Sequence, residues 1–439
     1  MKKLKTLILL GTTFATVACG GNVSALNSAK LLREPSKALY KSNVSDNGYD
    51  SFKIKLADFS TKFSESFLKS YCEGEENITI SPLSLEMCLG LAICASNGES
   101  RQEMLDVFDM DFVTFNKYYK RLYGEYNDTI KNDDGDVMLQ LLMTNSIWID
   151  DNFELYDSGL DALRDDYYCY SYNTDFSDSE ICNRAIEEFI EIQTKGLLKP
   201  KLNFDFRTIF VLMNTLYLKD IWNSYGTELN FSDNSNYYFV NSNKEKSSKK
   251  LLEGYYSAGR TIETENYSSF FTETNDGFKI HFIKPNDGKT LKEVFTKETM
   301  DYVMSNNYVF KDDVKKENYF TRAIFPEFNA DCDVDFKSIL MKDFNIKSIF
   351  KSETCDFSNL ISGEVYCSGV NQIAKLDVNK KGIEGAAVTY MPVCGETAIF
   401  EEEKYKDIYE DFVVNKEFGF ILTYKDSVLF SGVINNIDK

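Results

Sequence analysis

The amino-acid sequence predicts an α+β domain in which helices come first and strands later. Apolar residues recur at helical spacing in the early part of the chain, and runs rich in Val, Ile, Phe and Tyr dominate from about residue 230 onward. Helices and strands do not alternate as they do in βαβ units. No repeat or Pro- and Gly-rich linker interrupts residues 50–439, so we interpret residues 49–439 as one domain.

Three helices are predicted near the start of this domain. The second begins at Ser81-Pro-Leu-Ser84, where proline suits the first turn, and ends around Asn97. Ser100-Arg-Gln-Glu103 has the form of a capping box and predicts the start of the third helix. The first is amphipathic, with apolar residues at three- or four-residue spacing: Phe52, Leu56, Phe59, Phe63 and Phe67.

The rest of the domain is predicted to consist largely of buried strands, with a further helix over residues 186–192. Two strands, over residues 138–149 and 208–219, are rich in Val, Leu and Ile. Two apolar runs near the C-terminus, residues 418–424 and 428–434, predict two further strands.

The first residues match the pattern of a signal peptide. Lysines precede an apolar run at residues 7–10, and small residues precede Cys19. We therefore predict a signal peptide over residues 1–18 and a secreted, extracellular protein. Residues 16–19 also resemble a bacterial lipoprotein cleavage site, so lipidation at Cys19 stays open as the one route to a membrane.

Residues 19–48 are polar and aperiodic, which predicts a flexible leader. The whole chain has a net charge of −20. This charge argues against nucleic acid, anionic membranes and heparin as partners. We expect a monomer without a cofactor.

The residue types needed for common catalytic and metal sites are scarce. The chain has ten cysteines but no CxxC pair, and its only histidine is His281, so we expect no metal site. His281 alternates with Phe278, Ile280 and Phe282, which predicts that it lies on the wetter face of a strand. Because the usual catalytic motifs are also absent, we expect no enzyme. A disulfide between Cys355 and Cys367 stays open.

One segment suits both an exposed loop and a strand. Residues 382–389 are small, nearly apolar and free of proline, with a single charge at Glu384. A period of two predicts that the side chains of Ile383, Gly385, Ala387 and Thr389 share one face. We expect this face to fit the interior of a sheet and Glu384 to face solvent on the other side.

Seven segments of the chain are similar to the motifs of one known family and occur in that family's order. They are residues 77–84 (N-x-x-x-S-P-x-S), 194–196 (T-x-G), 214–222 (N-x-x-x-F-K-G-x-W), 325–328 (L-P-K-F), 356–358 (D-F-S), 382–389 (G-T-E-A-A-A-A-T) and 429–433 (L-F-x-G). With these motifs the chain resembles the serpin family over residues 51–437.

The resemblance implies a serpin fold with three β-sheets, eight or nine helices and an exposed reactive loop. It also implies a suicide-substrate inhibitor of a serine or cysteine endopeptidase, with which the cleaved loop forms a covalent acyl complex. A non-inhibitory carrier, chaperone or storage protein is the alternative. The implied hinge of the loop consists of Gly382, Ile383, Glu384, Gly385, Ala386, Ala387, Val388 and Thr389.

The resemblance also implies roles for residues around the hinge. Trp222 is the family's tryptophan, and Asn371 replaces a buried histidine. Lys380 and Glu327 reverse the signs of a family ion pair, so we expect the two to attract each other. The residues implied at the opening of the central sheet are Asn77, Ser81, Ser84, Asn214 and Asn371.

The implied reactive bond is Glu396-Thr397, and Lys404-Tyr405 is one of the neighbouring bonds that stay open. The acidic residues 401–411 that follow are either a solvated flap or an exosite for basic proteases. Ile383 stands where the family usually has threonine, which we expect to slow insertion of the loop.

Overall fold

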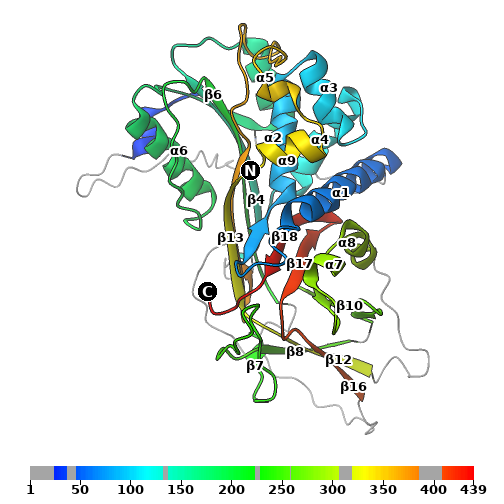
Figure 1. The fold of residues 1–439 in the computed structure, drawn as a ribbon. Helices are drawn as coiled ribbons and strands as arrows, with labels where there is room; N and C mark the ends of the chain where they lie inside the picture. Colours follow the sequence, from blue (N-terminus) through cyan, green and yellow to red (C-terminus); the bar gives the residue numbers. More distant parts are fainter. Residues whose placement is uncertain are drawn as a thin grey trace, which may run out of the picture.

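A computed structural model describes residues 24–36, 46–131, 137–222, 228–257, 259–305, 319–384 and 408–439. These residues form three β-sheets and nine α-helices (Figure 1). The predicted α+β class is confirmed. No helix within the described ranges is long and apolar enough to cross a membrane. The proposed signal peptide and Cys19 lie outside these residues.

The large sheet has eight strands and contains the first residues of the implied hinge. Its neighbours pair antiparallel except β4 and β5, which are parallel. Its strands, in spatial order, are β1 (Lys30–Arg33), β5 (Cys169–Thr174), β4 (Val137–Asp150), β6 (Phe210–Ile221), β15 (Gly382–Glu384), β14 (Asn371–Asn379) and β13 (Phe328–Asp335), with β3 (Asp128–Lys131) paired to β4.

Two smaller sheets complete the β structure. The six-stranded sheet is antiparallel and runs β2 (Ile78–Ile80), β18 (Ser427–Ile434), β17 (Phe418–Tyr424), β11 (Lys279–Pro285), β10 (Tyr267–Glu273) and β9 (Thr261–Glu263). The four-stranded sheet runs β16 (Ile408–Val413), β12 (Tyr319–Phe325), β8 (Leu252–Ser257) and β7 (Asn230–Phe231).

His281 lies inside the six-stranded sheet, and the prediction that it faces water is wrong. The side chain is 1% exposed, and Phe278, Ile280 and Phe282 are fully buried as well. Strand β11 is covered on both faces, so alternation along it does not separate a wet face from a dry one. Burial, and then the charge of Lys279, lower the pKa of His281 to about 3. His281 therefore stays neutral at physiological pH.

The helices cover the sheets on several sides (Figure 1). Helix α2 is buried nearly all round in the main core, with Ser81 as its N-cap and Pro82 in its first turn. Helix α2 spans Pro82–Ala95. The other helices are α1 (Asn47–Leu68), α3 (Gly98–Asp106), α4 (Phe112–Glu125), α5 (Asp157–Tyr167), α6 (Ser179–Gln193), α7 (Leu291–Val294), α8 (Lys297–Met304) and α9 (Lys337–Asp343).

The predicted capping box does not form. Helix α3 begins at Gly98, two residues before Ser100, and Asn97 makes no side-chain cap. The Glu103 carboxylate instead accepts hydrogen bonds from the backbone N–H groups of Lys347 and Ser348, each at 2.7 Å. The Glu103 side chain, which the local sequence pattern assigns to the capping box, is thus used in a long-range contact.

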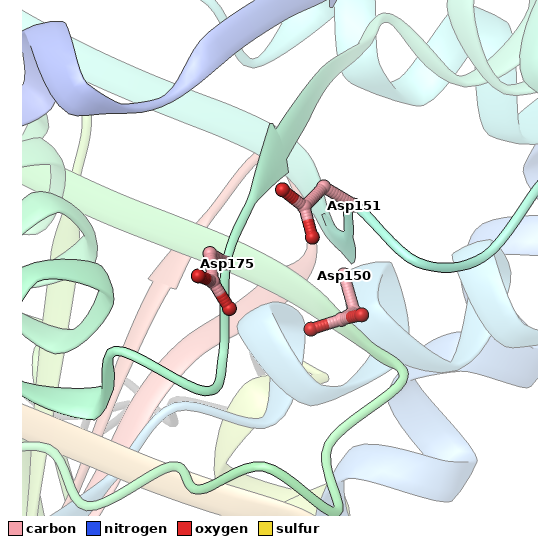
Figure 2. A group of neighbouring side chains, drawn as sticks. All are labelled: Asp150, Asp151 and Asp175. Atoms are coloured by element: carbon pink, nitrogen blue, oxygen red, sulfur yellow. The ribbon is translucent and has the colours of Figure 1, made fainter.

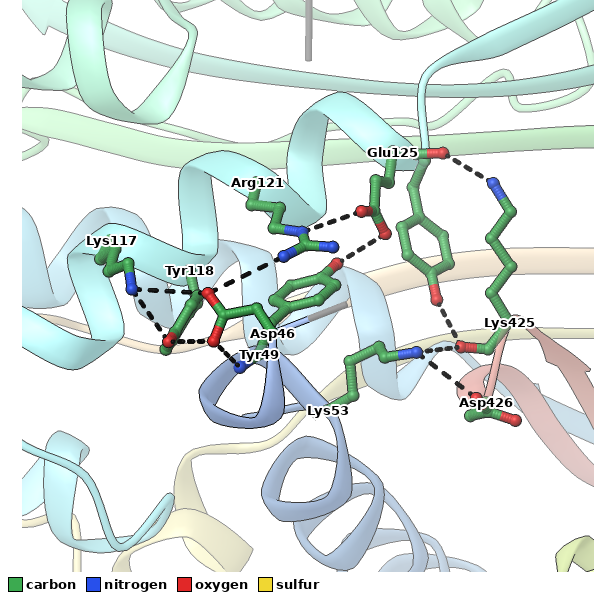
Figure 3. A network of polar contacts seen from close by, with 10 residues as sticks. Asp46, Tyr49, Lys53, Lys117, Tyr118, Arg121, Glu125, Lys425 and Asp426 are labelled. Atoms are coloured by element: carbon green, nitrogen blue, oxygen red, sulfur yellow. Dashed lines mark hydrogen bonds and ion pairs between the residues drawn. The ribbon is translucent and has the colours of Figure 1, made fainter. Parts of the chain in front are cut away.

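Asp46 joins the start of α1 to α4 (Figure 3). Its carboxylate caps α1 by accepting from the N–H groups of Gly48 and Tyr49, and it also accepts from the Tyr118 hydroxyl at 3.0 Å. Across the same network the Tyr49 hydroxyl donates to Glu125 at 2.9 Å (Figure 3). These bonds fix the first helix against the fourth.

Part of the expected flexible leader is ordered. Residues Ala25–Ser28 form a short 3-10 helix, and β1 follows it at the edge of the large sheet. Glu188 of α6 accepts hydrogen bonds from Ser24 Oγ at 2.6 Å and from Leu26 N at 2.9 Å. At the other end, Arg33 pairs with Asp157 and Asp161 of α5 at 2.5 and 3.0 Å. The expectation of a flexible leader is therefore corrected for residues 24–36, which we call the N-terminal strap.

The cysteines in the described part of the chain are free thiols, so the disulfide between Cys355 and Cys367 is not formed. Burial raises the pKa of both thiols to about 11. Both thiols are thus protonated at neutral pH.

Candidate functional site

The start of the hinge is a short strand wedged between two longer ones. Strand β15 turns back from β14 at Lys380 and Lys381 and pairs antiparallel with both β14 and β6. Ile383 lies opposite Val378 on one side and Asp220 on the other. Within the described residues, β6 and β14 form no ladder with each other, and β15 lies between them. We call the line between β6 and β14 the seam.

Gly382 brings β15 close to the backbone of β6. A Cβ atom at this position would lie 2.1 Å from the carbonyl oxygen of Asp220 and 2.8 Å from Cα of Ile221. Both are backbone atoms, which cannot move aside as the end of a flexible side chain can. The first residue of the hinge is therefore glycine for a steric reason.

The two residues after Gly382 point to opposite faces, as the period of two predicts. Ile383 is fully buried in the main core. Glu384 faces the other way, but it is half-buried and not in open solvent. Its Oε1 atom lies 3.1 Å from Lys219 Nζ, and each side chain is 17% exposed. Burial raises the pKa of Glu384, and Lys219 opposes that rise.

Trp222 clamps the turn between β14 and β15. Its indole Nε1 donates to the carbonyl oxygen of Asn379 at 2.7 Å, and its backbone N–H donates to Lys381 at 3.2 Å. The ring is 2% exposed and packs edge-on against Phe325. The tryptophan implied by the resemblance thus holds the entry to the hinge.

Lys380 and Glu327 do meet, but not as the expected ion pair. Glu327 Oε1 accepts a hydrogen bond from the backbone N–H of Lys380 at 2.8 Å. The Lys380 ammonium instead pairs with Glu228 at 2.6 Å. Both carboxylates raise the pKa of Lys380, and Glu228 has the larger effect. The junction is therefore fixed by a bond from a side chain to the backbone.

Ser84 and Asn214 form part of a polar chain under the large sheet. Ser84 Oγ donates to Asn214 Oδ1 at 2.8 Å, and Asn214 Nδ2 donates to Asn145 Oδ1 at 2.9 Å. Asn145 in turn donates to the hydroxyl of Tyr119 at 2.9 Å. Ser84 and Asn214, both implied at the opening of the central sheet, are thus in contact, and the polar chain continues to two residues that were not predicted.

Asn371 does not replace the family's buried histidine in this network. Its side chain is exposed, whereas the next residue, Gln372, is 9% exposed and faces the core. Gln372 Oε1 accepts from Ser81 N at 2.7 Å, and its Nε2 donates to Ser81 O at 2.8 Å. Ser81 Oγ also donates to Leu429 O at 2.7 Å. The prediction was wrong by one residue.

Asn77 binds the C-terminal segment and also β13 of the large sheet, where its Nδ2 donates to Asn329 O at 3.3 Å. Its Nδ2 donates to Asn436 O at 2.6 Å, while its Oδ1 accepts from the N–H groups of Asn435 and Asn436 at 3.0 Å. These bonds anchor the C-terminal segment next to β2. Asn77 therefore stabilises the fold, and none of its described hydrogen bonds reaches residues 382–384.

Sequence analysis missed Lys219 and Asp220 beside β15, and also Gln372, which binds Ser81. Asp220 stands at the glycine of the family pattern N-x-x-x-F-K-G-x-W, which was the available signal. The remaining hinge residues, Gly385, Ala386, Ala387, Val388 and Thr389, lie outside the described residues. So do the reactive bond Glu396-Thr397, the alternative Lys404-Tyr405 and residues 401–407 of the acidic tract.

Three aspartates gather at the ends of β4 and β5: Asp150, Asp151 and Asp175 (Figure 2). Asp150 accepts hydrogen bonds from Asn152 N and Phe176 N, both at 3.0 Å. Asp175 accepts from Ser177 N at 2.8 Å. These bonds explain the two carboxylates as caps of turns.

Comparison with known proteins identifies the family. A family model described as serpin (serine protease inhibitor) matches residues 55–437. The chain belongs to the serpin family. Human serpin I2 is 24% identical to this serpin over 387 residues, covering 83% of this chain and 87% of the relative. Antichymotrypsin-2 of Bombyx mori is 22% identical over 409 residues, covering 90% and 98%.

Solved structures show the same fold. The serpin matches native tengpin, a thermophilic serpin, with a TM-score of 0.70 and 18% identity, covering 93% of this chain and 100% of tengpin. Serpin48 of the insect Tenebrio molitor gives a TM-score of 0.67 at 20% identity, covering 88% and 98%. The predicted serpin fold with three sheets is confirmed.

Proposed function

We propose that this serpin is a secreted, extracellular suicide-substrate inhibitor of a serine endopeptidase or, as a second class of target, a cysteine endopeptidase. One observation carries the proposal: the first three hinge residues already form β15, which pairs with both β6 and β14 in the described residues. A loop that continues along this seam gains two ladders of backbone hydrogen bonds.

The register supports insertion of the whole hinge after cleavage. If the loop continued the pairing of β15, residues 385–389 would lie opposite residues 218–214 of β6 and 376–372 of β14. Gly385 would then face the buried side beside Leu218 and Leu376, which are 1% and 0% exposed. Thr389 would reach the level of Asn214 and Gln372, where its hydroxyl would find polar partners. The apolar face of the hinge thus matches the buried face of the sheet.

The chemistry is that of the protease, and this chain supplies the substrate bond and the strand. The serine Oγ of the protease attacks the carbonyl carbon at the reactive bond. An ester bond forms, the peptide bond breaks, and the serine proton leaves with the freed amine. Insertion of the loop before hydrolysis of the ester traps the enzyme, as in the known example of serpin loop insertion.

Charge helps to define the partner. With Glu396-Thr397 as the reactive bond, the target has a basic specificity pocket.

A basic run on α4 offers little to heparin because its cations have carboxylate partners. Lys117 lies 3.5 Å from Asp46, Lys120 lies 3.2 Å from Asp166, and Arg121 lies 3.0 Å from Glu125.

The test is incubation with a panel of serine and cysteine endopeptidases. We expect a complex that survives SDS with one class of protease, and mass spectrometry of the released C-terminal peptide identifies the bond. Ala387→Arg places a charge on the inserting face and should convert the protein into a substrate that is cut without a complex. Cleavage of the unmodified chain without any complex would support the non-inhibitory carrier, chaperone or storage protein instead.

A further inference from the structure

A buried carboxyl group lies directly beside the inserted hinge. Asp220 is 2% exposed and is the register partner of Ile383 on β15. Its Oδ1 accepts from Ile221 N at 2.8 Å, and its Oδ2 accepts from Asp276 N at 3.0 Å. Because paired residues of antiparallel strands share a face, the apolar side chain of Ile383 helps to shield this carboxyl from water.

No described cation compensates a charge on Asp220. The turn between β10 and β11 brings Asp276, whose Oδ2 atom is buried without a hydrogen-bond partner, together with the hydroxyl of Thr274. On β14 the register partner of Ile383 is Val378, which carries no charge. The nearest cation along β6, Lys219, lies on the opposite face, where it pairs with Glu384.

These surroundings favour the neutral form of Asp220. Burial, and to a smaller extent the charge of Asp276, raise the pKa of Asp220 to about 7, although hydrogen bonds from Thr274, Asp276 and Ile221 oppose the rise. Removing β15 from the seam would uncover the carboxyl group and let water solvate its charge, which lowers its pKa toward the ordinary value of about 4.

We propose that Asp220 couples insertion of β15 to the pH of the solution, so that the hinge is held more tightly in mild acid than above neutral pH. The proposal rests on the proposed role of residues 382–389 as an inserting hinge. It assigns a regulatory role to a residue that stands where the family pattern has glycine.

The sign follows from proton linkage. The inserted state binds a proton at Asp220 more tightly than the released state does. The stabilisation of the inserted state is therefore complete in acid, below the pKa of the released state, and is lost as pH rises through the pKa of the inserted state. For one proton with a pKa near 7, insertion should weaken about tenfold between pH 6 and pH 8.

Amide hydrogen exchange of the intact chain tests this without any protease. Protection factors, which remove the intrinsic pH dependence of exchange, are measured for the amides of β15 between pH 5 and pH 9. We expect a fall of about tenfold between pH 6 and pH 8. Asp220→Asn should remove this dependence, and Asp333→Asn, an exposed aspartate on β13, should leave it unchanged.

Asp276→Asn gives a second test if Asp220→Asn does not fold. It removes the facing charge and should move the fall in protection to lower pH. A flat profile in the unmodified chain, or an unchanged fall in Asp220→Asn, would overturn the proposal. This readout needs no protease, so it separates the two proposals. If no covalent complex forms with any protease but the pH profile is as expected, only the proposal of inhibition fails.

Discussion

Glu384 Oε1 accepts a hydrogen bond from Lys219 Nζ at 3.1 Å and so ties the hinge to β6 on the face opposite Ile383. The pair is half-buried, because each side chain is only 17% exposed. Exposed ion pairs contribute little, whereas a buried charge that loses its partner is costly. This contact should therefore help to hold the first hinge residues in the sheet.

Lys219→Met should loosen the hinge. It leaves the Glu384 carboxylate half-buried without its cation, and we expect a loss of about 1 kcal/mol in the free energy of unfolding. Urea unfolding measures this loss. Glu384→Gln removes the charge together with the need for a partner, so it should cost less, and the double variant should show coupling. Equal losses in both single variants and simple additivity would contradict this role.

Gly382→Ala should displace β15. The added methyl group meets the β6 backbone at 2.1 Å, so the hinge must leave the seam or the strands must separate. We expect a loss of about 2–3 kcal/mol, typical of overpacking. Gly74→Ala is the matched control, because its Cβ would meet the nearest atom, Tyr71 O, at an ordinary 3.4 Å. A Gly382→Ala variant as stable as Gly74→Ala would show that the close approach is absent in solution.

Glu327 and Lys380 offer a direct test of how the hinge junction is held. Glu327→Ala removes the acceptor of the Lys380 backbone N–H and should cost about 1 kcal/mol, while Glu327→Gln keeps an acceptor and should cost less. Lys380→Ala should change stability little, because its ammonium pairs with Glu228 at the surface. If Lys380→Ala proved as harmful as Glu327→Ala, the two residues would form an ion pair after all.

The N-terminal strap should stabilise α6 on the large sheet. Glu188→Ala removes the acceptor of two hydrogen bonds, from Ser24 and Leu26, and we expect a loss of about 1–2 kcal/mol. Hydrogen exchange should also become faster in α6. Glu180→Ala changes an exposed carboxylate of the same helix and serves as the control. Unchanged exchange in Glu188→Ala would mean that the strap does not hold the helix.

The sequence predicted much of the fold because regular helices and strands give a strong periodic pattern of apolar residues. The strand expected at residues 418–424 is β17, with the same bounds, and the alternation at Ile383 and Glu384 sends the two side chains to opposite faces. Such patterns reflect local geometry, which any strand shares. The motifs of the family then placed these elements in order.

What failed depended on register or on distant contacts. Asn371 and Gln372 are neighbours on one strand, so an error of one residue exchanges the core face and the exposed face. The partner of the Lys380 ammonium is Glu228, which the resemblance gave no reason to consider. The strap looked aperiodic because its order comes from Glu188, more than 160 residues away in sequence.

Thermal unfolding before and after a single cut in the loop tests the central claim most directly. The chain is nicked by limited proteolysis between residues 390 and 405, and the unfolding midpoints of the intact and cut proteins are compared. If the cut loop enters the seam between β6 and β14, the midpoint should rise by about 10 °C or more, which corresponds to several kcal/mol. An equal or lower midpoint after the cut would contradict loop insertion.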